Sequence, residues 1–423
     1  MQLQWAMLAA GVIVLSSCAA RASEAFDACA AASASQYEAG YDKTGFDSSK
    51  MDTARAIELC TTALAAEPDS APLKAWLGRA YATAGDATTA ATYLEPASLA
   101  GNVLAQTLLG DMLIVGDGVP QDMVRGAELL RLAADAGFAP AEDSLGLSYD
   151  FAEGVDQDHV EAARLYRRAA EKGLPRAMTN LAAMYASGMG LDRDLVAAAA
   201  WYQRGSDLGD AGAQFNLGKL FEEGALGEPD FGRAAKLYRA AAEQGDVLAA
   251  NALGLLTQYG SGTNRDEAEA VVLFRQAADA GLAEAQFNLA LMYENGIGVP
   301  QDYALARQHY RQASESGNAD AAANLGLLYL NGSGSAPDFA KALQFTQRAA
   351  DGGSAVGINN LGHLYEYGLG VAPDAEQALA LYSQAAELGY APGADNHARL
   401  EATLSAPRDP ALIKVYPKSK IAN

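Results

Sequence analysis

Residues 282–317 read LAEAQFNLALMYENGIGVPQDYALARQHYRQASESG, and they decide the fold because they are one copy of a repeating unit. The chain from residue 102 to residue 389 divides into eight consecutive blocks of 36 residues, without insertion or deletion. Every block has leucine at its eighth position, aspartate at its twenty-first and glycine at its last. A fixed period of this length indicates stacked supersecondary units, which present an extended surface to other molecules and rarely contain a catalytic pocket.

The order of residue types within one block predicts a pair of helices. In residues 282–317, apolar side chains such as Leu289 recur at spacings of three and four, and Gly296 ends this first helix. Asp302 begins a second helix, because its carboxylate accepts backbone N–H groups of the first turn, and Gly317 ends it. Glycine or alanine at the ninth position lets the two helices approach closely, and aromatic residues such as Tyr310 fill the space between neighbouring pairs. No pair can bury these side chains alone, so each is expected to stack on the next.

These residues resemble the Sel1-like repeat family, a branch of the tetratricopeptide superfamily. The shared pattern is A-x-x-x-L-G-x-x-Y-x-x-G-x-G-V-x-x-D, followed by Ala and then Y-x-x-A-A-x-x-x-G, and it is plain in residues 285–317 and 177–209. The resemblance implies an all-α fold, a right-handed α-superhelix of helix-turn-helix repeats from about residue 23 to residue 404, that serves as an adaptor. Three blocks depart from the pattern, with Ala152 for the first loop glycine, Thr257 in the aromatic column, and Leu226-Gly227 for Gly-Val.

The segments outside the array have their own signals. Leu77, Gly78 and Tyr81 follow the spacing of tetratricopeptide repeats, whereas residues 36–52 are rich in Gly, Ser and Asp and are expected to form a loop. After the array we expect a short capping helix over Asp395–Leu404. The predicted organisation is a signal peptide at residues 1–22, tetratricopeptide-like helices at 23–101, eight repeats at 102–389, a capping helix at 390–404 and a flexible tail at 405–423.

The N-terminus predicts export. Residues 5–15 are apolar and too short to span a bilayer, which is typical of a signal-peptide core. The sequence Leu-Ser-Ser-Cys that ends at Cys18 matches a lipobox and predicts lipid attachment, whereas Ala-Arg-Ala before Ser23 is an equally acceptable ordinary cleavage site. Residues 1–5 contain no Lys or Arg, which departs from both types, and a buried N-terminal helix of a cytosolic protein is the remaining alternative. No other segment is expected to span a membrane, so we predict a periplasmic protein or an outer-membrane lipoprotein that faces the periplasm.

The cysteines and histidines limit which disulfides and metal sites the chain can form. Beyond Cys18 only Cys29 and Cys60 remain, and we expect a disulfide between them that staples the least repetitive end of the solenoid. Such a bond is worth about 2–4 kcal/mol. Two buried thiols are the alternative. The four histidines are scattered without metal-ligand spacing, so neither a metal nor another cofactor is expected.

The charge and the absence of catalytic motifs exclude further classes of protein. A formal net charge of −22 repels nucleic acid, favours a monomer and is expected to attract basic proteins, although acidic surfaces are common in proteins without such partners. The Gly-x-Gly pairs, such as Gly296 and Gly298, follow helices and recur with the repeat, so they are turn glycines rather than a dinucleotide-binding loop. Some members of the resembled family are labelled β-lactamases, but those have a disulfide in each repeat. No block here contains Cys or a Ser-x-x-Lys motif.

We therefore predict a non-enzymatic interaction scaffold of the bacterial cell envelope, which binds a segment of an envelope protein in its concave groove. The resemblance implies that the first helices line this groove, where asparagine at the seventh position can hold a peptide backbone or carboxylate. An asparagine ladder that bonds neighbouring repeats is the alternative. The candidate groove residues are Asn180, Asn216, Asn251, Tyr259, Phe287, Asn288, Leu291, Glu294, Asn324, Asn359, Asn360, His363 and Tyr367.

Within this set we expect the later repeats to bind, through aromatic anchors such as Phe287 and Tyr367 that should point away from the inter-repeat core. The earlier repeats have smaller residues, such as Ala183 and Ala186, at matching places. The alternative function is a cell-wall-directed hydrolase or a β-lactamase-like member of the repeat family. It would need a site in residues 36–52, and an acid–base pair within one groove would favour it.

Overall fold

The structure is a computed structural model that describes residues 23–41 and 50–405. Within these ranges the regular secondary structure is α-helical, and no β-strand is present. The predicted signal peptide at residues 1–22 and the lipid anchor at Cys18 lie outside the described residues, as does the predicted tail from residue 406 onward. For the part of the chain that is described, the prediction of an all-α solenoid is confirmed.

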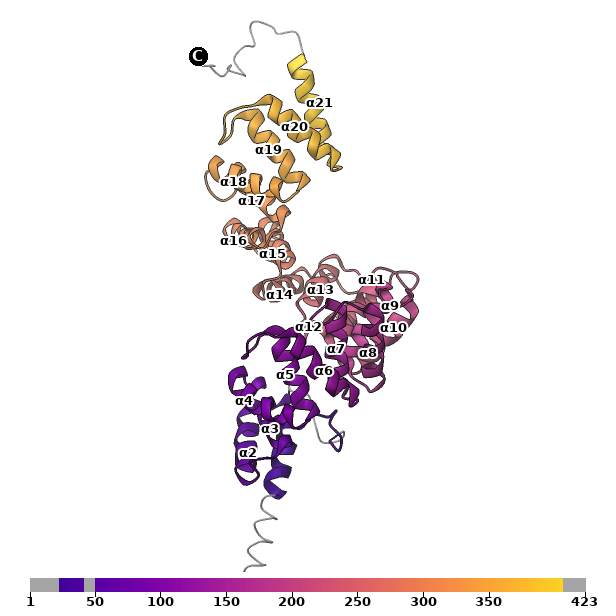
Figure 1. Ribbon diagram of the computed structural model, residues 1–423. Coiled ribbons are helices and arrows are strands. Elements are labelled where there is room, and N and C mark those ends of the chain that lie inside the picture. Colours follow the sequence, from indigo (N-terminus) through magenta and orange to yellow (C-terminus); the bar gives the residue numbers. More distant parts are fainter. Residues whose placement is uncertain (1–22, 42–49, 406–423) are drawn as a thin grey trace, which may run out of the picture. The chain divides into compact units, whose positions relative to one another are not determined.

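The chain forms two compact units, Met1–Leu217 and Gly218–Asn423, and the division between them falls within α11 (Ala211–Glu222). Figure 1 shows the helices along the sequence. In the first unit a helix of residues 23–33 precedes α2 (Thr53–Ala66), α3 (Ala71–Thr83), α4 (Ala87–Leu99), α5 (Val103–Val115), α6 (Met123–Asp135), α7 (Ala139–Phe151), α8 (His159–Glu171), α9 (Pro175–Ser187) and α10 (Leu195–Asp207). The second unit contains α12 (Phe231–Ala242), α13 (Val247–Tyr259), α14 (Glu267–Asp279), α15 (Ala283–Asn295), α16 (Tyr303–Glu315), α17 (Ala319–Asn331), α18 (Phe339–Asp351), α19 (Ala355–Tyr367), α20 (Ala375–Glu387) and α21 (Ala391–Ser405).

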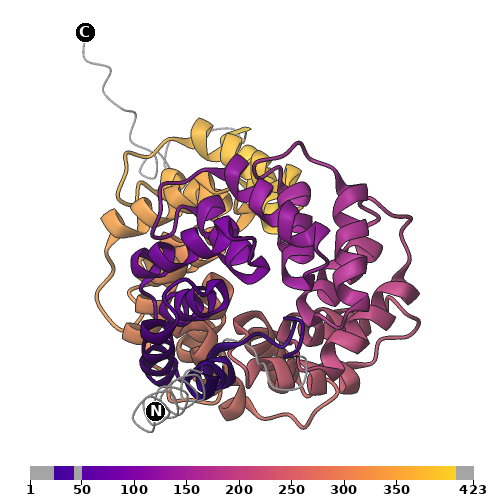
Figure 2. The same cartoon turned by 60° about the horizontal axis from the view of Figure 1, so that its bottom comes forward.

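Each 36-residue block forms one helix pair, with an odd-numbered first helix and an even-numbered second helix from α5 to α20. In Figure 2 the purple and magenta pairs of the first unit follow one another side by side. The predicted helix ends are confirmed. Asp302 accepts hydrogen bonds from the backbone N–H groups of Ala304 and Leu305 at 2.8 and 3.0 Å. Gly317 has a φ of 94°, in the left-handed region that ends a helix with least strain on glycine.

In most blocks the small ninth residue makes room for an aromatic ring of the second helix in the same block; in the first and seventh blocks Leu130 and Thr346 take the place of the ring. A Cβ atom added at Gly254 would lie 2.7 Å from the Phe274 ring, and one at Gly362 would lie 2.9 Å from the ring of Tyr382. The rings also reach the next pair, as predicted: Tyr310 belongs to a buried cluster that includes Leu325 of the following repeat. One contact therefore closes each pair and also helps to join it to its neighbour.

The second loop glycine packs against the preceding repeat. A Cβ atom at Gly298 would lie 2.3 Å from the carbonyl oxygen of Glu267, and one at Gly370 would lie 2.3 Å from that of Phe339. Glu267 and Phe339 begin the second helices of the preceding blocks. The loop of each of these repeats thus crosses the start of its neighbour's second helix too closely for any side chain, which explains this glycine beyond its role in the turn.

Neighbouring pairs approach each other more closely on the side of the first helices. There a short side chain bridges two repeats, because Asn288 Nδ2 on α15 donates to Asn251 Oδ1 on α13 at 2.9 Å. Between the second helices α12 and α14 the longer side chains of Arg239 and Glu269 form the bridge, at 2.7 Å. The closer side of a curved stack is its concave side, so we call the first-helix side the inner face of each unit.

The N-terminal segment is tied to the first unit by the predicted disulfide. Cys29 and Cys60 form a bond with an S–S distance of 2.00 Å, and both residues are fully buried. The chain then continues along α3, where Trp76 Nε1 donates to the Glu38 carboxylate at 3.1 Å and Arg79 donates to the Ser33 carbonyl at 2.8 Å. We call residues 34–41 the N-terminal strap.

The predictions for the remaining segments differ from the structure in one boundary. The capping helix, α21, begins at Ala391 rather than Asp395. The reason is that α21 packs as a ninth first helix, in which Asn396 Nδ2 donates to Asn359 Oδ1 of α19 at 2.9 Å. The predicted loop at residues 36–52 contains no α-helix in its described parts, 36–41 and 50–52.

Ala152 generates the first testable prediction, because it is the one non-glycine residue with a positive φ, 61°, among the described residues. The left-handed conformation costs an L-residue with a Cβ atom about 1 kcal/mol. Ala152→Gly should therefore increase the free energy of unfolding by about 1 kcal/mol in urea titrations. Ala183→Gly is the matched control, since Ala183 lies exposed within α9, and it should lower the free energy of unfolding by about 1 kcal/mol. Equal destabilisation by both changes would contradict this explanation.

Candidate binding face

The inner face of the second unit carries a row of aliphatic side chains. The third, seventh, tenth and fourteenth positions of each block lie on the side of the first helix opposite its buried positions, and we call them the inner stripe. At the tenth position, successive repeats place Leu255, Leu291, Leu327 and then His363. Leu327 is 37% exposed, and the other three are half-buried. One apolar contact point per repeat is therefore available over three consecutive repeats.

Larger exposed side chains lie at the edge of this row. Tyr259 and Tyr367, both at the fourteenth position, are 70% and 52% exposed, and Leu248 at the third position is 48% exposed. The ring of His363 lies 4.7 Å from that of Tyr367, measured between centroids. Burial lowers the pKa of His363, and its Nδ1 atom has no hydrogen-bond partner among the described residues. Aromatic side chains of this kind are the usual anchors of protein interfaces.

The first helices of these repeats lack cationic side chains. α13, α15, α17 and α19 contain no Lys or Arg, whereas they contain four carboxylates, Glu284, Glu294, Asp320 and Glu366. The Arg and Lys residues of repeats five to eight all lie in the second helices or the turns. The inner face formed by α13, α15, α17 and α19 is therefore apolar and acidic, whereas the flanking α11 and α21 carry Lys219 and Arg399 at the tenth position.

Three of the four carboxylates form hydrogen bonds within the fold. Glu294 accepts from the hydroxyl of Tyr310 at 2.5 Å, and Glu366 accepts from that of Tyr382 at 2.7 Å. Glu366 also receives two hydrogen bonds from Arg399, at 2.7 and 2.6 Å. Burial opposes the ionisation of Glu366, but these hydrogen bonds outweigh it and hold its pKa below the ordinary value of 4.5. Asp320 accepts from the hydroxyl of Ser354 at 2.7 Å, and both its carboxylate and that of Glu284 are exposed.

The predicted groove asparagines bond mainly within the chain. Asn180 and Asn288 each donate to the preceding first helix, the former to Asp143 at 2.9 Å. Asn324 donates to the hydroxyl of Tyr310 at 3.2 Å, and Asn216 to a backbone carbonyl of its own helix. Asn359 Nδ2 donates to the side-chain oxygen of Asn360, Oδ1, at 3.3 Å. The ladder that was the alternative interpretation therefore exists in part, as bridges between positions seven and six of neighbouring repeats.

The Phe287 side chain does not point in the predicted direction. Instead of pointing away from the inter-repeat core, it packs against the buried cluster of α15 to α18, with its ring centroid 5.8 Å from that of Tyr310. Phe287 lies at the sixth position of its block, next to the neighbouring first helix, which accounts for its burial. Leu255 and Leu327 were missed in the sequence, although they share the tenth position with Leu291. Comparing that column between blocks would have found them.

Side chains on the inner face of the first unit form contacts with other parts of the same chain. Asp143 is fully buried and forms an ion pair with Arg176 of the next first helix. Burial raises the pKa of Asp111 to about 6, despite its hydrogen bond with Ser144 and the nearby Arg176. Tyr37 of the N-terminal strap packs against two buried clusters, one around α2 to α7 and one around α7 to α9. Covered by these contacts, the first unit offers less open inner surface than the second.

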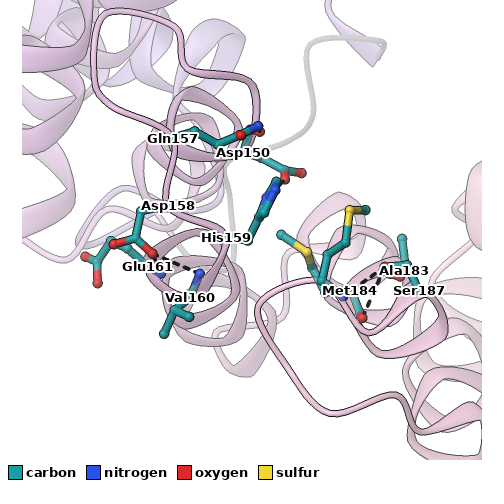
Figure 3. A network of polar contacts seen from close by, with 10 residues as sticks. Asp150, Gln157, Asp158, His159, Val160, Glu161, Ala183, Met184 and Ser187 are labelled. Atoms are coloured by element: carbon teal, nitrogen blue, oxygen red, sulfur yellow. Dashed lines mark hydrogen bonds and ion pairs between the residues drawn. The ribbon is translucent and has the colours of Figure 1, made fainter.

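An acid–base pair also lies in the first unit, at the turn between α7 and α8 (Figure 3). His159 Nδ1 is 2.7 Å from Asp150 Oδ1. Ser187, on the neighbouring first helix, donates to the backbone carbonyls of Ala183 and Met184 at 2.9 and 3.3 Å. Both hydrogen bonds that this serine donates stay within α9, and the His159–Asp150 pair lies outside residues 36–52, where the alternative function was expected to place its site. Among the described residues, no group of His, Cys, Asp or Glu could hold a metal ion, and no helix is long and apolar enough to cross a membrane.

The fold and the open inner face define an α-solenoid of helix pairs, and comparisons identify its family. Eight consecutive segments match the Sel1 repeat model, at residues 103–138, 139–174, 175–210, 211–246, 247–282, 283–318, 319–354 and 355–390. They cover 288 of 423 residues, so the chain belongs to the Sel1 repeat family, whose repeats mediate protein interactions. Residues 50–111 match a tetratricopeptide repeat model, which confirms the predicted type of the N-terminal helices.

Solved structures of bacterial proteins share this architecture. A Sel1 repeat protein from Oxalobacter formigenes is 29% identical with a TM-score of 0.54, and the match covers 73% of this chain and 89% of that chain. A protective antigen of uropathogenic Escherichia coli strains, which displays an SLR fold, is 27% identical with a TM-score of 0.51. That match covers 88% of this chain and 86% of the other. No curated protein matches the chain.

Asp111 generates a prediction about pH. Because its folded pKa of about 6 exceeds its ordinary value of 3.8, the protonated form favours folding. This stability is fully present below pH 3.8 and is lost as the pH rises through about 6. Asp111→Asn should therefore raise the unfolding free energy at pH 7.5 by about 1 kcal/mol and flatten its pH dependence between the two values. Urea titrations across this range measure both effects, and a variant less stable than wild type at pH 7.5 would contradict the assignment.

Proposed function

We propose that this protein is an exported, non-enzymatic scaffold that binds a segment of another envelope protein on the inner face of its second unit. The single observation that carries the proposal is the row formed by Leu255, Leu291 and Leu327, together with the exposed Tyr259 and Tyr367. A binding groove needs apolar anchors with surface left open to a partner. Leu327, Tyr259 and Tyr367 are 37%, 70% and 52% exposed, whereas Leu255 and Leu291 are half-buried, the latter against the cluster of α15 to α18. The contacts that occupy part of the inner face of the first unit support the choice of the second.

Two observations support export. The Cys29–Cys60 bond is of a kind that persists in oxidising compartments such as the periplasm. The Escherichia coli relative is a protective antigen, which suits a protein that leaves the cytoplasm. Together with the apolar residues 5–15, these observations favour the periplasm or a lipid-anchored place on its outer boundary.

The partner can be tested by photo-crosslinking in intact cells. A benzoylphenylalanine at position 327 should capture a protein partner, whereas one at position 272, which is exposed on the second helix α14, should not. The double change Leu327→Ser and Tyr367→Ala should lower the affinity for the captured partner about 30-fold, equivalent to the loss of about 2 kcal/mol. Val272→Ser with Leu388→Ser is the matched control, because both residues are exposed away from the inner face. A partner that is lost only in the control variant would place binding on the outer face.

Export is tested by intact-mass analysis of protein purified from its native host. A mass that begins at Ser23 with two hydrogens fewer than the reduced chain would match ordinary cleavage and the Cys29–Cys60 bond. A chain that begins at Cys18 with an added diacylglyceryl group would match the lipoprotein route. Retention of Met1 would contradict export, and two free thiols in periplasmic protein would contradict the disulfide.

A further inference from the structure

The sequence that follows the last helix has the chemistry that the inner face of the second unit lacks. Residues 406–423 read APRDPALIKVYPKSKIAN, with four basic residues and one acidic residue, a formal charge of +3. Residues 218–405 contain 11 Lys and Arg against 23 Asp and Glu, a formal charge of −12. A basic segment is therefore tethered to a strongly acidic series of helices.

We propose that residues 406–423 bind in cis along the inner stripe of the second unit and compete there with the partner segment. The inference rests on the proposed function, because it uses the same face. It adds the chemistry of the ligand: a basic, proline-containing segment with two apolar side chains, Leu412 and Val415, three residues apart. It also adds a regulatory consequence, since a partner must displace the chain's own segment.

The spacing of apolar residues in the segment matches the spacing of the repeats. Packed helices lie about 8–10 Å apart, so Leu255, Leu291 and Leu327 recur at roughly this distance. Pro407, Pro410 and Pro417 favour an extended polyproline-like backbone. Such a backbone advances about 3.1 Å per residue with three residues per turn, so side chains three apart share one face about 9 Å from each other. Leu412 and Val415 have this separation.

The segment begins in a place from which it can reach the stripe. α21 ends at Ser405, and its Asn396 bonds to Asn359 of α19, so α21 continues the layer of first helices. The fourteenth positions, with Tyr367 and Tyr259, end the first helices in the same direction. An extended segment of this length spans about 56 Å, whereas four helix spacings from α21 back to α13 need only about 40 Å.

Electrostatic attraction favours binding of residues 406–423 to the inner face. Lys414, Lys418 and Lys420 would meet the part of the face formed by α13, α15, α17 and α19, which contain no Lys or Arg and expose Glu284 and Asp320. The tether supplies an effective concentration of about 1 mM, so an intrinsic Kd of about 0.1 mM would keep the face about 90% occupied. Attraction between exposed charges weakens with salt, so occupancy should fall as the ionic strength rises.

The proposal is tested in the full chain with a benzoylphenylalanine at position 415, followed by irradiation and mass spectrometry. We expect intramolecular crosslinks to α13, α15 or α17, which weaken at least fivefold in 0.5 M salt. The change Leu327→Asp should abolish them, whereas Leu388→Asp on the other side should not, and thermal unfolding followed by circular dichroism checks that both variants fold. Crosslinks to second helices, crosslinked dimers, or the absence of crosslinks in the folded chain would each overturn the proposal.

Competition is tested with the partner captured from position 327. Reversing the charges with Lys414→Glu, Lys418→Glu and Lys420→Glu should tighten partner binding about tenfold, because the internal competitor is removed. Unchanged or weaker partner binding in this variant would overturn the competition. If partner capture from position 327 succeeds while position 415 makes no contact, the internal-ligand proposal fails and the proposed function stands. If position 415 crosslinks to the stripe but no partner is ever captured there, the proposed function fails instead.

Discussion

The close contact between each second helix, through an aromatic ring in most repeats, and the glycine or alanine of its first helix is the constraint on which the structure depends. Gly254 lies against Phe274 and Gly362 against Tyr382, at distances that leave no room for a Cβ atom. Such a contact fixes how the two helices of a pair cross, and rings such as Tyr310 also pack against the next pair. Since the core is built from one side of every first helix, the opposite side is left for other uses.

The two units put that opposite side to different uses. In the first unit an ion pair between the buried Asp143 and the exposed Arg176, together with the N-terminal strap, covers part of it. In the second unit it carries Leu255, Leu291 and Leu327, with no cationic side chain on the same helices. One repeat pattern thus supports a closed face and an open face, because the inner stripe is free to vary while the core positions are not.

Much of the fold could be predicted from the sequence, because the repeat fixes the core and the helix ends. The aspartate caps, such as Asp302, and the left-handed glycines, such as Gly317, follow from residue chemistry alone. The candidate site was less accessible. Whether an asparagine bonds to the next repeat depends on the residue at position six of its neighbour, as in Asn288 and Asn251, and that is a contact between distant parts of the sequence. The burial of Phe287 is of the same kind.

Hydroxyl-radical footprinting of the second unit, with and without a bound partner segment, tests the central claim most directly. It reads the solvent exposure of individual side chains. The account predicts that Leu327, Tyr259 and Tyr367 lose reactivity on binding, while Val272 and Leu388, exposed to 60% and 55% away from the inner face, keep theirs. Protection of Val272 and Leu388 with unchanged reactivity of the inner stripe would contradict it.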